Sequence, residues 1–254
     1  MSRILHGKLS EEAILINKAT NFPRFKGHSF RYRNFKIEVS DFLSVAWQIK
    51  EFFGDERMAF YSEESDPVII DCGSNVGISA LYFKSIFPQA RITCFEADPA
   101  IAEILKRNLK SNGAADVVVH QKAVWTHSKG VSFGSEGADG GSVQDGGNTV
   151  FVPSVRFKEI LQQFDRVDLL KIDIEGAEVE VLGDCSEELY RVKYLYVEYH
   201  SLSDRPQELD KLLLVLKNNG FRYYINRIGA FHAKPFINVQ DAAMDIQLDI
   251  HAIR

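Results

Sequence analysis

Three stretches of this 254-residue chain carry residue types that can hold a ligand or move a proton. The first is Asp71-Cys-Gly-Ser-Asn-Val-Gly77, an acid and a glycine-rich turn after an apolar run. Gly73 permits a tight turn that approaches a ligand closely, and Gly77 permits the next helix to pack against the strand. Free amides at that helix N-terminus suit the carboxylate of an amino-acid ligand, and Asp71 suits its ammonium group. Asn75 stands where a dinucleotide-binding fingerprint needs another glycine, so the turn does not predict a pyrophosphate site.

The second stretch is Phe95-Glu96-Ala97-Asp98-Pro99. Glu96 ends an apolar strand about 20 residues after the glycine turn, a spacing at which an acid accepts hydrogen bonds from ribose hydroxyls. Asp98 is better interpreted as the N-cap of a helix that has Pro99 at its first position. The two stretches together predict an adenosine-type ligand, but they do not separate NAD from S-adenosylmethionine.

The third stretch combines Lys171-Ile-Asp-Ile-Glu-Gly-Ala-Glu178 with Glu198-Tyr-His200. Period-two alternation places Lys171 and Asp173 on one face of a strand, and the two titratable residues of the later segment also share a face. We therefore expect several titratable groups to converge on the rim where a substrate would lie. The two later acids of the first segment have an equally good interpretation as stabilisers of a helix N-terminus, and His200 can instead be structural.

The elements that must position these residues follow a regular alternation from Pro67 onward. Expected strands are 68–70, 91–95, 117–119, 167–174 and 192–197; expected helices are 78–87, 98–113, 156–164, one from 178, and 204–219. Short apolar strands that alternate with amphipathic helices predict right-handed βαβ units and a parallel sheet. Residues 221–225 and 246–253 are expected to close that sheet as an antiparallel pair.

Two segments depart from this alternation. Residues 1–66 are predicted to form an N-terminal cap, with a short helix after Ser10, a strand over 30–39 and a helix over 41–53. The cap either packs on the core or covers the substrate side, and residues 67–254 form the catalytic domain. A glycine-rich insertion at about 130–150 is expected to be a hairpin or a mobile loop.

Composition narrows the classes of function. The net charge of −5 argues against a nucleic-acid partner, because such proteins usually present a basic field. The polar start has no apolar stretch of a signal peptide, and no apolar run is long enough to span a bilayer. Three cysteines cannot all pair, and two lie in expected buried strands. We therefore expect a cytoplasmic protein without a membrane partner; a homodimer is left open.

The chain resembles the FkbM family of class I S-adenosylmethionine-dependent methyltransferases. The resemblance covers about Pro67 to Ser201 and is carried by 68–77, 94–99, 167–178 and 198–200, with Lys171–Glu178 the most specific segment. Ser74 and Ala97 stand where the family usually has Ala and often has Pro. The resemblance implies an α/β, Rossmann-like fold with a mostly parallel, twisted seven-stranded sheet, helices on both faces and a small N-terminal cap. It also implies O-methylation of a hydroxyl on a sugar, a glycan or a secondary metabolite.

The expected cofactor is S-adenosylmethionine, and the expected cofactor-binding residues are Asp71, Gly73, Ser74, Asn75, Gly77, Glu96, Ala97, Ala123 and Asp173. The expected catalytic residues are His200, Asp173, Glu198 and Lys171. His200 is the first candidate for the general base, because imidazole titrates near neutral pH. Asp173 or Glu198 would orient it or replace it, and Lys171 would stabilise the acids.

Three alternatives stay open. We expect no resident metal, although Asp173, Glu175, Glu178, Glu198 and His200 offer enough ligands for Mg²⁺. An NAD-dependent oxidoreductase lacks support from the glycine turn and from the 171–178 segment. A non-catalytic module that binds S-adenosylmethionine would not need the rim acids or the histidine.

Overall fold

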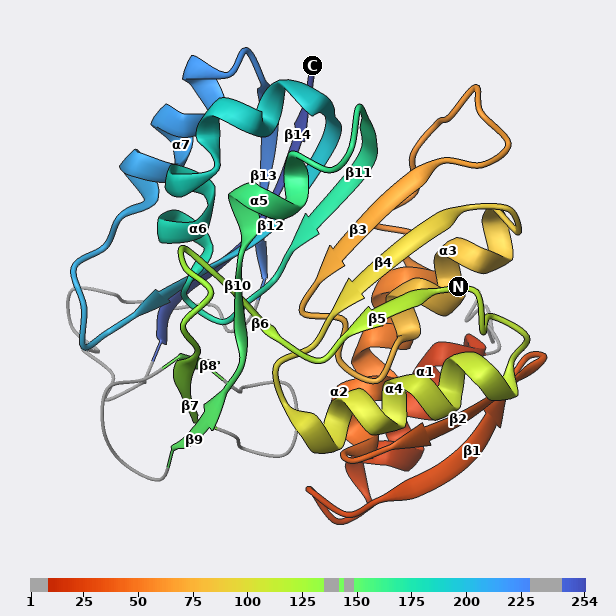
Figure 1. Ribbon diagram of the computed structural model, residues 1–254. Coiled ribbons are helices and arrows are strands. Elements are labelled where there is room, and N and C mark those ends of the chain that lie inside the picture. Colours follow the sequence, from red (N-terminus) through yellow and green to blue (C-terminus); the bar gives the residue numbers. More distant parts are fainter. Residues whose placement is uncertain (1–8, 135–141, 144–148, 229–243) are drawn as a thin grey trace, which may run out of the picture.

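A seven-stranded, mostly parallel sheet forms the centre of the protein (Figure 1). The computed structural model describes residues 9–134, 142–143, 149–228 and 244–254. The strand order is β13-β14-β12-β11-β3-β4-β5. The strands are β3 (Val68–Cys72), β4 (Arg91–Phe95), β5 (Val118–His120), β11 (Val167–Ile172), β12 (Val192–Leu202), β13 (Arg222–Ile228) and β14 (Met244–Ile253). Only β14 runs antiparallel to its neighbours β12 and β13, which confirms the expected parallel sheet with a closing antiparallel pair.

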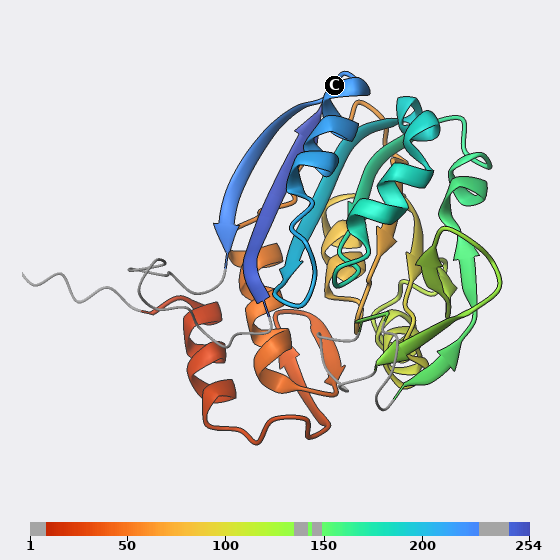
Figure 2. The same cartoon turned by 90° about the vertical axis from the view of Figure 1, so that its left-hand side faces the viewer.

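Helices cover both faces of this sheet (Figures 1 and 2). One face carries α3 (Ile78–Ile86) and α4 (Pro99–Ser111); the other carries α5 (Phe157–Leu161), α6 (Glu178–Asp184), the 3-10 turn η2 (Ser186–Arg191) and α7 (Leu209–Asn218). The start of α4 follows the expected capping logic, since Asp98 Oδ1 accepts from the amides of Ala100 and Ile101 at 2.7 and 3.2 Å. The Rossmann-like layers expected from the sequence are therefore confirmed.

The N-terminal segment is a separate layer of short elements. It consists of α1 (Glu11–Thr20), β1 (His28–Tyr32), β2 (Phe35–Val39), α2 (Phe42–Ile49) and the π-helical turn η1 (Lys50–Gly54). The prediction of one strand over 30–39 is wrong, because the chain reverses at Arg33 and the two halves pair as a hairpin. Arg33 has a φ of 49°, and the apolar alternation continues across this turn, so the pattern hid it.

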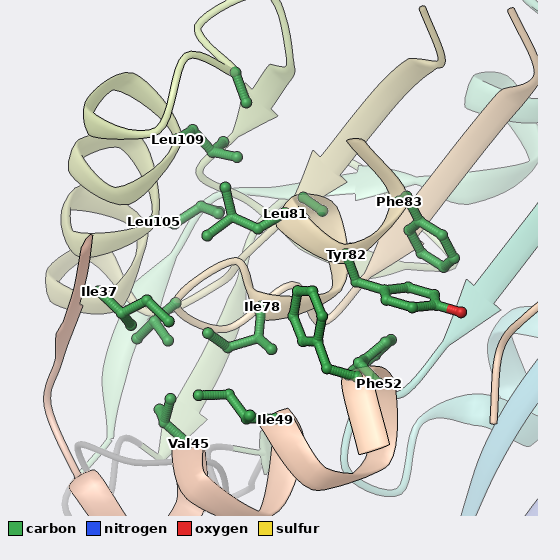
Figure 3. Packing of buried hydrophobic residues seen from close by; sticks show 14 of the residues in the cluster. Ile37, Val45, Ile49, Phe52, Ile78, Leu81, Tyr82, Phe83, Leu105 and Leu109 are labelled. Atoms are coloured by element: carbon green, nitrogen blue, oxygen red, sulfur yellow. The ribbon is translucent and has the colours of Figure 1, made fainter. Parts of the chain in front are cut away.

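This segment shares a hydrophobic core with α3 and α4 (Figure 3). Ile37 and Ile49 from the segment belong to the same cluster of buried side chains as Ile78 and Leu105. Polar bonds add to the contact. Asn108 on α4 accepts from the amide of Glu38 at 2.8 Å and donates to the carbonyls of Glu38 and Val76 at 2.8 and 2.9 Å. The boundary at 66/67 stays a prediction, and the two sides of it are packed together.

The glycine-rich insertion is only partly described. Strand β7 (Val131–Gly134) pairs antiparallel with β8 (Ser142–Val143) and with β9 (Val150–Val152). Beside them, β6 (Ala123–Trp125) pairs parallel with β10 (Ser154–Arg156). Residues 135–141 and 144–148, on which part of the hairpin prediction falls, lie outside the described residues.

Several element ends differ from expectation. Strand β11 ends at Ile172 rather than 174, and helix α5 ends at Leu161 rather than 164. Strand β12 continues to Leu202 rather than ending at Val197, because β14 pairs along its whole second half. Helix α7 begins at Leu209 rather than 204, since Pro206 removes a donor and biases the residue before it away from helical geometry. Among the described residues, no helix combines the length and the apolar character needed to cross a membrane.

Candidate functional site

The glycine turn after β3 lies against the backbone at the end of β11. Gly73 has a φ of +80°, and its amide donates to the carbonyl of Phe95 at 3.0 Å. A Cβ added to Gly73 would lie 1.7 Å from the carbonyl oxygen of Asp173. Ser74, which is buried, donates from Oγ to the carbonyl of Asp71 at 2.8 Å. Glycine is thus required at position 73 because the end of β11 passes directly against the turn.

Gly77 has a different partner from the one expected. Its φ is +93°, and an added Cβ would lie 2.5 Å from Cδ1 of Leu105. The prediction that Gly77 lets the helix pack on the strand is therefore wrong as to the partner. The small residue instead allows the start of α3 to approach α4.

Glu96 stands at the end of β4 and braces the glycine turn. Its Oε2 accepts from the amide of Asn75 at 2.9 Å, and its Oε1 accepts from the amide of Asp98 at 2.9 Å. Burial raises the pKa of Glu96 to about 7, although these two bonds favour the ionised form. Each carboxylate oxygen has a second lone pair, so the group can still accept from two ribose hydroxyls.

Ala97 and Ala123 lie together beside this acid. Ala123 belongs to a small cluster of buried apolar residues that also contains Val131 and Phe133, and Ala97 packs against that cluster. The structure therefore brings the two expected cofactor-binding alanines to one place, at the junction of β4 with the small sheet.

The side chain of Lys171 connects the glycine turn to the carboxylate of Asp173. Its side chain is 4% exposed, and Nζ donates to the carbonyl of Gly73 and to Oδ2 of Asp173, both at 2.9 Å. Nζ also lies 3.3 Å from Oδ1 of Asp71. Burial alone would lower the pKa of Lys171, but the two carboxylates raise it above its ordinary value, so the ammonium stays charged.

Asp71 has partners other than the ligand ammonium group that the sequence suggested. The residue is fully buried, and its Oδ2 accepts from Oγ of Ser79 at 2.5 Å. Together with the contact to Lys171, this makes Asp71 an anchor beneath the turn.

His200 on β12 lies inside a cage of carboxylates. Its Nδ1 is 3.0 Å from Oε1 of Glu178, and its Nε2 is 3.4 Å from Oε2 of Glu175 and 3.5 Å from Oε1 of Glu198. The ring is completely buried. Burial alone would lower the pKa of His200, but hydrogen bonds to Glu178 and Glu198 raise it well above its ordinary value. The surrounding carboxylates therefore favour the protonated form of the imidazole over its neutral form.

The acids of the loop after β11 divide into two kinds. Glu178 is fully buried, and its Oε1 also accepts from the amides of Gly176 at 2.9 Å and Ile174 at 3.3 Å. Asp173 and Glu175 are partly exposed, at 23% and 22% of their side chains. Burial raises the pKa of both groups, with Glu198 adding to the rise for Asp173. These two acids face outward, whereas Glu178 is internal.

Sequence reasoning missed a set of residues that complete the site from distant segments. Gln247 on β14 donates to Glu198 and lies 3.3 Å from Nε2 of His200. Asp249 accepts from the Tyr196 hydroxyl at 2.5 Å. The sequence carried only part of this signal. Residues 246–253 were expected to pair with 221–225, whereas the pairing with β12 sets Gln247 opposite His200.

Two more missed residues come from the N-terminal segment. Arg57 donates to Oδ2 of Asp249 at 3.0 Å and lies 3.6 Å from Glu51. Burial raises the pKa of Glu51 to about 7, and the charge of Glu198 contributes to this rise. No local pattern marks either residue, so the sequence offered no signal for them.

Known proteins match this chain over the same region. Residues 71–223 match the family model of the methyltransferase FkbM domain. Methyltransferase sdnD of Sordaria araneosa is 30% identical in a match that covers 65% of this chain and 78% of that protein. The 2-O-methyltransferase NoeI of Sinorhizobium fredii (strain NBRC 101917 / NGR234) is 27% identical in a match that covers 54% of this chain and 65% of that protein.

The fold has a counterpart among solved structures. A S-adenosylmethionine-dependent methyltransferase from Agrobacterium tumefaciens superimposes with a TM-score of 0.53 at 8% identity, covering 92% of this chain and 72% of that one. At this identity the likeness concerns the arrangement of helices and strands alone.

Proposed function

Because the chain belongs to the FkbM family of S-adenosylmethionine-dependent methyltransferases, we propose that it methylates a hydroxyl oxygen of a sugar, a glycan or a secondary metabolite. One observation carries the proposal. Lys171 bonds at the same time to the carbonyl of the glycine turn and to the carboxylate of Asp173, so the expected cofactor turn and the acidic rim form one rigid unit. The name 2-O-methyltransferase of the relative NoeI supports oxygen as the atom that accepts the methyl group.

The residues around the glycine turn fit the cofactor. Glu96 offers a carboxylate at the end of β4 for the ribose hydroxyls. Ala97, which is partly exposed and packs on the cluster of the buried Ala123, offers an apolar surface beside it for an adenine ring. S-adenosylmethionine supplies a methyl group that is already electrophilic; its C–S bond breaks as the C–O bond forms, and S-adenosylhomocysteine leaves. The protein's main contribution is alignment, which in ideal cases is worth about 7–11 kcal/mol.

The acceptor hydroxyl must lose a proton, and we assign that proton to Asp173. His200 was the first candidate from sequence, but its ring is completely buried and both of its nitrogens already face carboxylates. Asp173 is partly exposed, and Lys171 holds only one of its oxygens. Glu198 is the second candidate for the base, with 15% of its side chain exposed. In this proposal His200 positions the carboxylates, and Lys171 stays protonated and offsets their charge.

Titration calorimetry with S-adenosylhomocysteine tests the cofactor assignment, with NADH as the comparison ligand. We expect saturable binding of S-adenosylhomocysteine alone, which Glu96→Ala weakens at least tenfold. Glu103→Ala is the matched control, because Glu103 is an exposed acid on α4 that pairs with Lys106. Binding of NADH instead, or equal effects of the two variants, would remove the proposal.

A turnover assay tests the chemistry. The protein is incubated with S-adenosylmethionine and a panel of hydroxylated sugars and metabolites, and S-adenosylhomocysteine release is measured. We expect Asp173→Asn to abolish release for any acceptor that the wild type methylates. Cofactor binding with no turnover on the panel would instead favour a non-catalytic binding module.

A further inference from the structure

We propose that Asp173, Glu175 and His200 bind a divalent metal ion with mixed oxygen and nitrogen preference, of which Mn²⁺ is the representative. Each residue offers one ligand atom, and these three atoms all lie within 4.8 Å of one another. Two of them come from the loop after β11 and one from β12, so the ligands converge from adjacent strands. The sequence left metal binding as the less favoured alternative, because spacing alone cannot show such convergence.

The spacing is close to what coordination requires. Metal–ligand bonds of about 2.1 Å place neighbouring ligands of one ion about 3 Å apart. Nε2 of His200 and Oε2 of Glu175 are 3.4 Å apart. Asp173 and Glu175 are both partly exposed, so small rotations of their side chains would complete the triangle.

The second observation is the support behind the histidine. A metal-bound imidazole usually gives its other ring nitrogen to a carboxylate that fixes its orientation. Here Glu178 takes that position at 3.0 Å from Nδ1, and two backbone amides fix its Oε1 in turn. This directs Nε2 of His200 toward Glu175 and Glu198.

One carboxylate oxygen of Glu178, Oε2, is buried without a hydrogen-bond partner among the described residues. The side chain as a whole is also completely buried. An unsatisfied buried carboxylate oxygen is costly, and a dication bound to Nε2 on the other side of the imidazole ring would offset part of that cost. Glu178 is not itself one of the three ligands.

The donor set selects the ion. Two carboxylates and one imidazole combine hard oxygen ligands with a borderline nitrogen ligand. This set suits Mn²⁺ better than it suits Ca²⁺, which prefers oxygen ligands alone. All three cysteines are buried and unpaired, and none is among the three ligands. Three protein ligands leave coordination positions open. If the proposed O-methylation holds, on which this consequence rests, the acceptor hydroxyl would occupy one of them. It would then lose its proton more readily to Glu198, the second candidate for the base, because the ion would hold Asp173.

Electron paramagnetic resonance of Mn²⁺ tests the site without any acceptor. Free Mn²⁺ gives a sharp six-line signal that shrinks on binding, so the signal is titrated with chelator-treated, dialysed protein. We expect stoichiometric binding that Glu175→Gln and His200→Gln each weaken by about tenfold or more, and Glu178→Gln by about 10–100-fold. Glu180→Gln is the matched control, since Glu180 is an exposed acid on α6 in the same segment.

Circular dichroism and thermal unfolding establish that each variant is folded. No loss of the free signal up to millimolar wild-type protein would overturn the site, and so would equal weakening by Glu175→Gln and Glu180→Gln. Calorimetry with S-adenosylhomocysteine is run on the same samples. Retained cofactor binding without Mn²⁺ binding overturns the metal site alone, whereas Mn²⁺ binding without cofactor binding overturns the proposed function alone.

Discussion

Position 73 requires glycine for two physical reasons, and replacement of Gly73 by alanine measures their combined effect. The first is its φ of +80°, which a residue with a Cβ adopts at a cost of about 1–2 kcal/mol. The second is the carbonyl oxygen of Asp173, which the new Cβ would meet at 1.7 Å. Real Cβ contacts are essentially never under 3.0 Å, so one backbone must retreat by at least 1.3 Å, the difference between these two distances. Neither partner is a flexible side chain, so the strain cannot be relieved by a rotamer change.

Gly113 provides the matched control, because its φ is +77° and nothing lies within 4 Å of an added Cβ. Gly113→Ala should therefore cost only the backbone term of about 1–2 kcal/mol. Gly73→Ala should cost a further 1–3 kcal/mol or so from overpacking. It should also weaken S-adenosylhomocysteine binding at least tenfold, because it displaces the turn that Lys171 holds. Urea unfolding gives the stabilities, and calorimetry gives the affinities.

The reasoning would be refuted if Gly73→Ala were no less stable than Gly113→Ala and bound the cofactor product equally well. That result would mean that the end of β11 does not press on the glycine turn. A loss of stability without loss of binding would keep the contact but remove its link to the cofactor.

The remaining predictions concern single side chains. Lys171→Met should destabilise the fold by about 3–5 kcal/mol in urea unfolding, since it leaves buried carboxylates without their cation, and a cost under about 1 kcal/mol would contradict this. Asn108→Ala should cost about 2–4 kcal/mol by the same assay, because three hydrogen bonds to backbone groups are lost; a neutral result would show that the N-terminal segment does not depend on them. Affinity for S-adenosylhomocysteine should fall as the pH drops below about 7, by up to tenfold per unit, because the raised pKa protonates Glu96 and converts an acceptor oxygen into a donor. Calorimetry between pH 5.5 and 8 measures this, and a flat profile there would rule out Glu96 as the titrating acceptor.

Local patterns predicted the layers of the fold well. The cap at Asp98, the alternation of strands and helices and the closing antiparallel pair all depend on residues near one another in sequence. The hairpin at Arg33 was not predicted, because a residue other than glycine adopts a positive φ there and the sequence has no typical turn dipeptide at that point. Patterns of apolar alternation report which face is buried, and they do not report where a chain reverses.

The site was predictable to the level of which acids share a rim, because strand periodicity fixes the face of each residue. The protonation of these acids was not predictable from sequence, because it depends on partner residues from distant segments of the chain such as β14. The sequence made His200 the first candidate for the base, but it could not show that Glu178 lies against its Nδ1 and Glu198 near its Nε2. Arg57 reaches this region across 192 residues of sequence to Asp249, a separation over which no motif can be recognised.

The insertion of β14 between β12 and β13 determines when the site can exist during folding. The bond from Tyr196 to Asp249 joins residues 53 positions apart, and Gln247 reaches Glu198 across 49. A nascent chain that has released β3 to β12 can bury most of the parallel sheet, yet its rim acids still lack their partners from β14. Such non-local pairings form slowly, because the loop entropy is lost before the contacts are gained. The carboxylates on β12 therefore acquire these partners only after β14, the last strand in the sequence, has paired with β12.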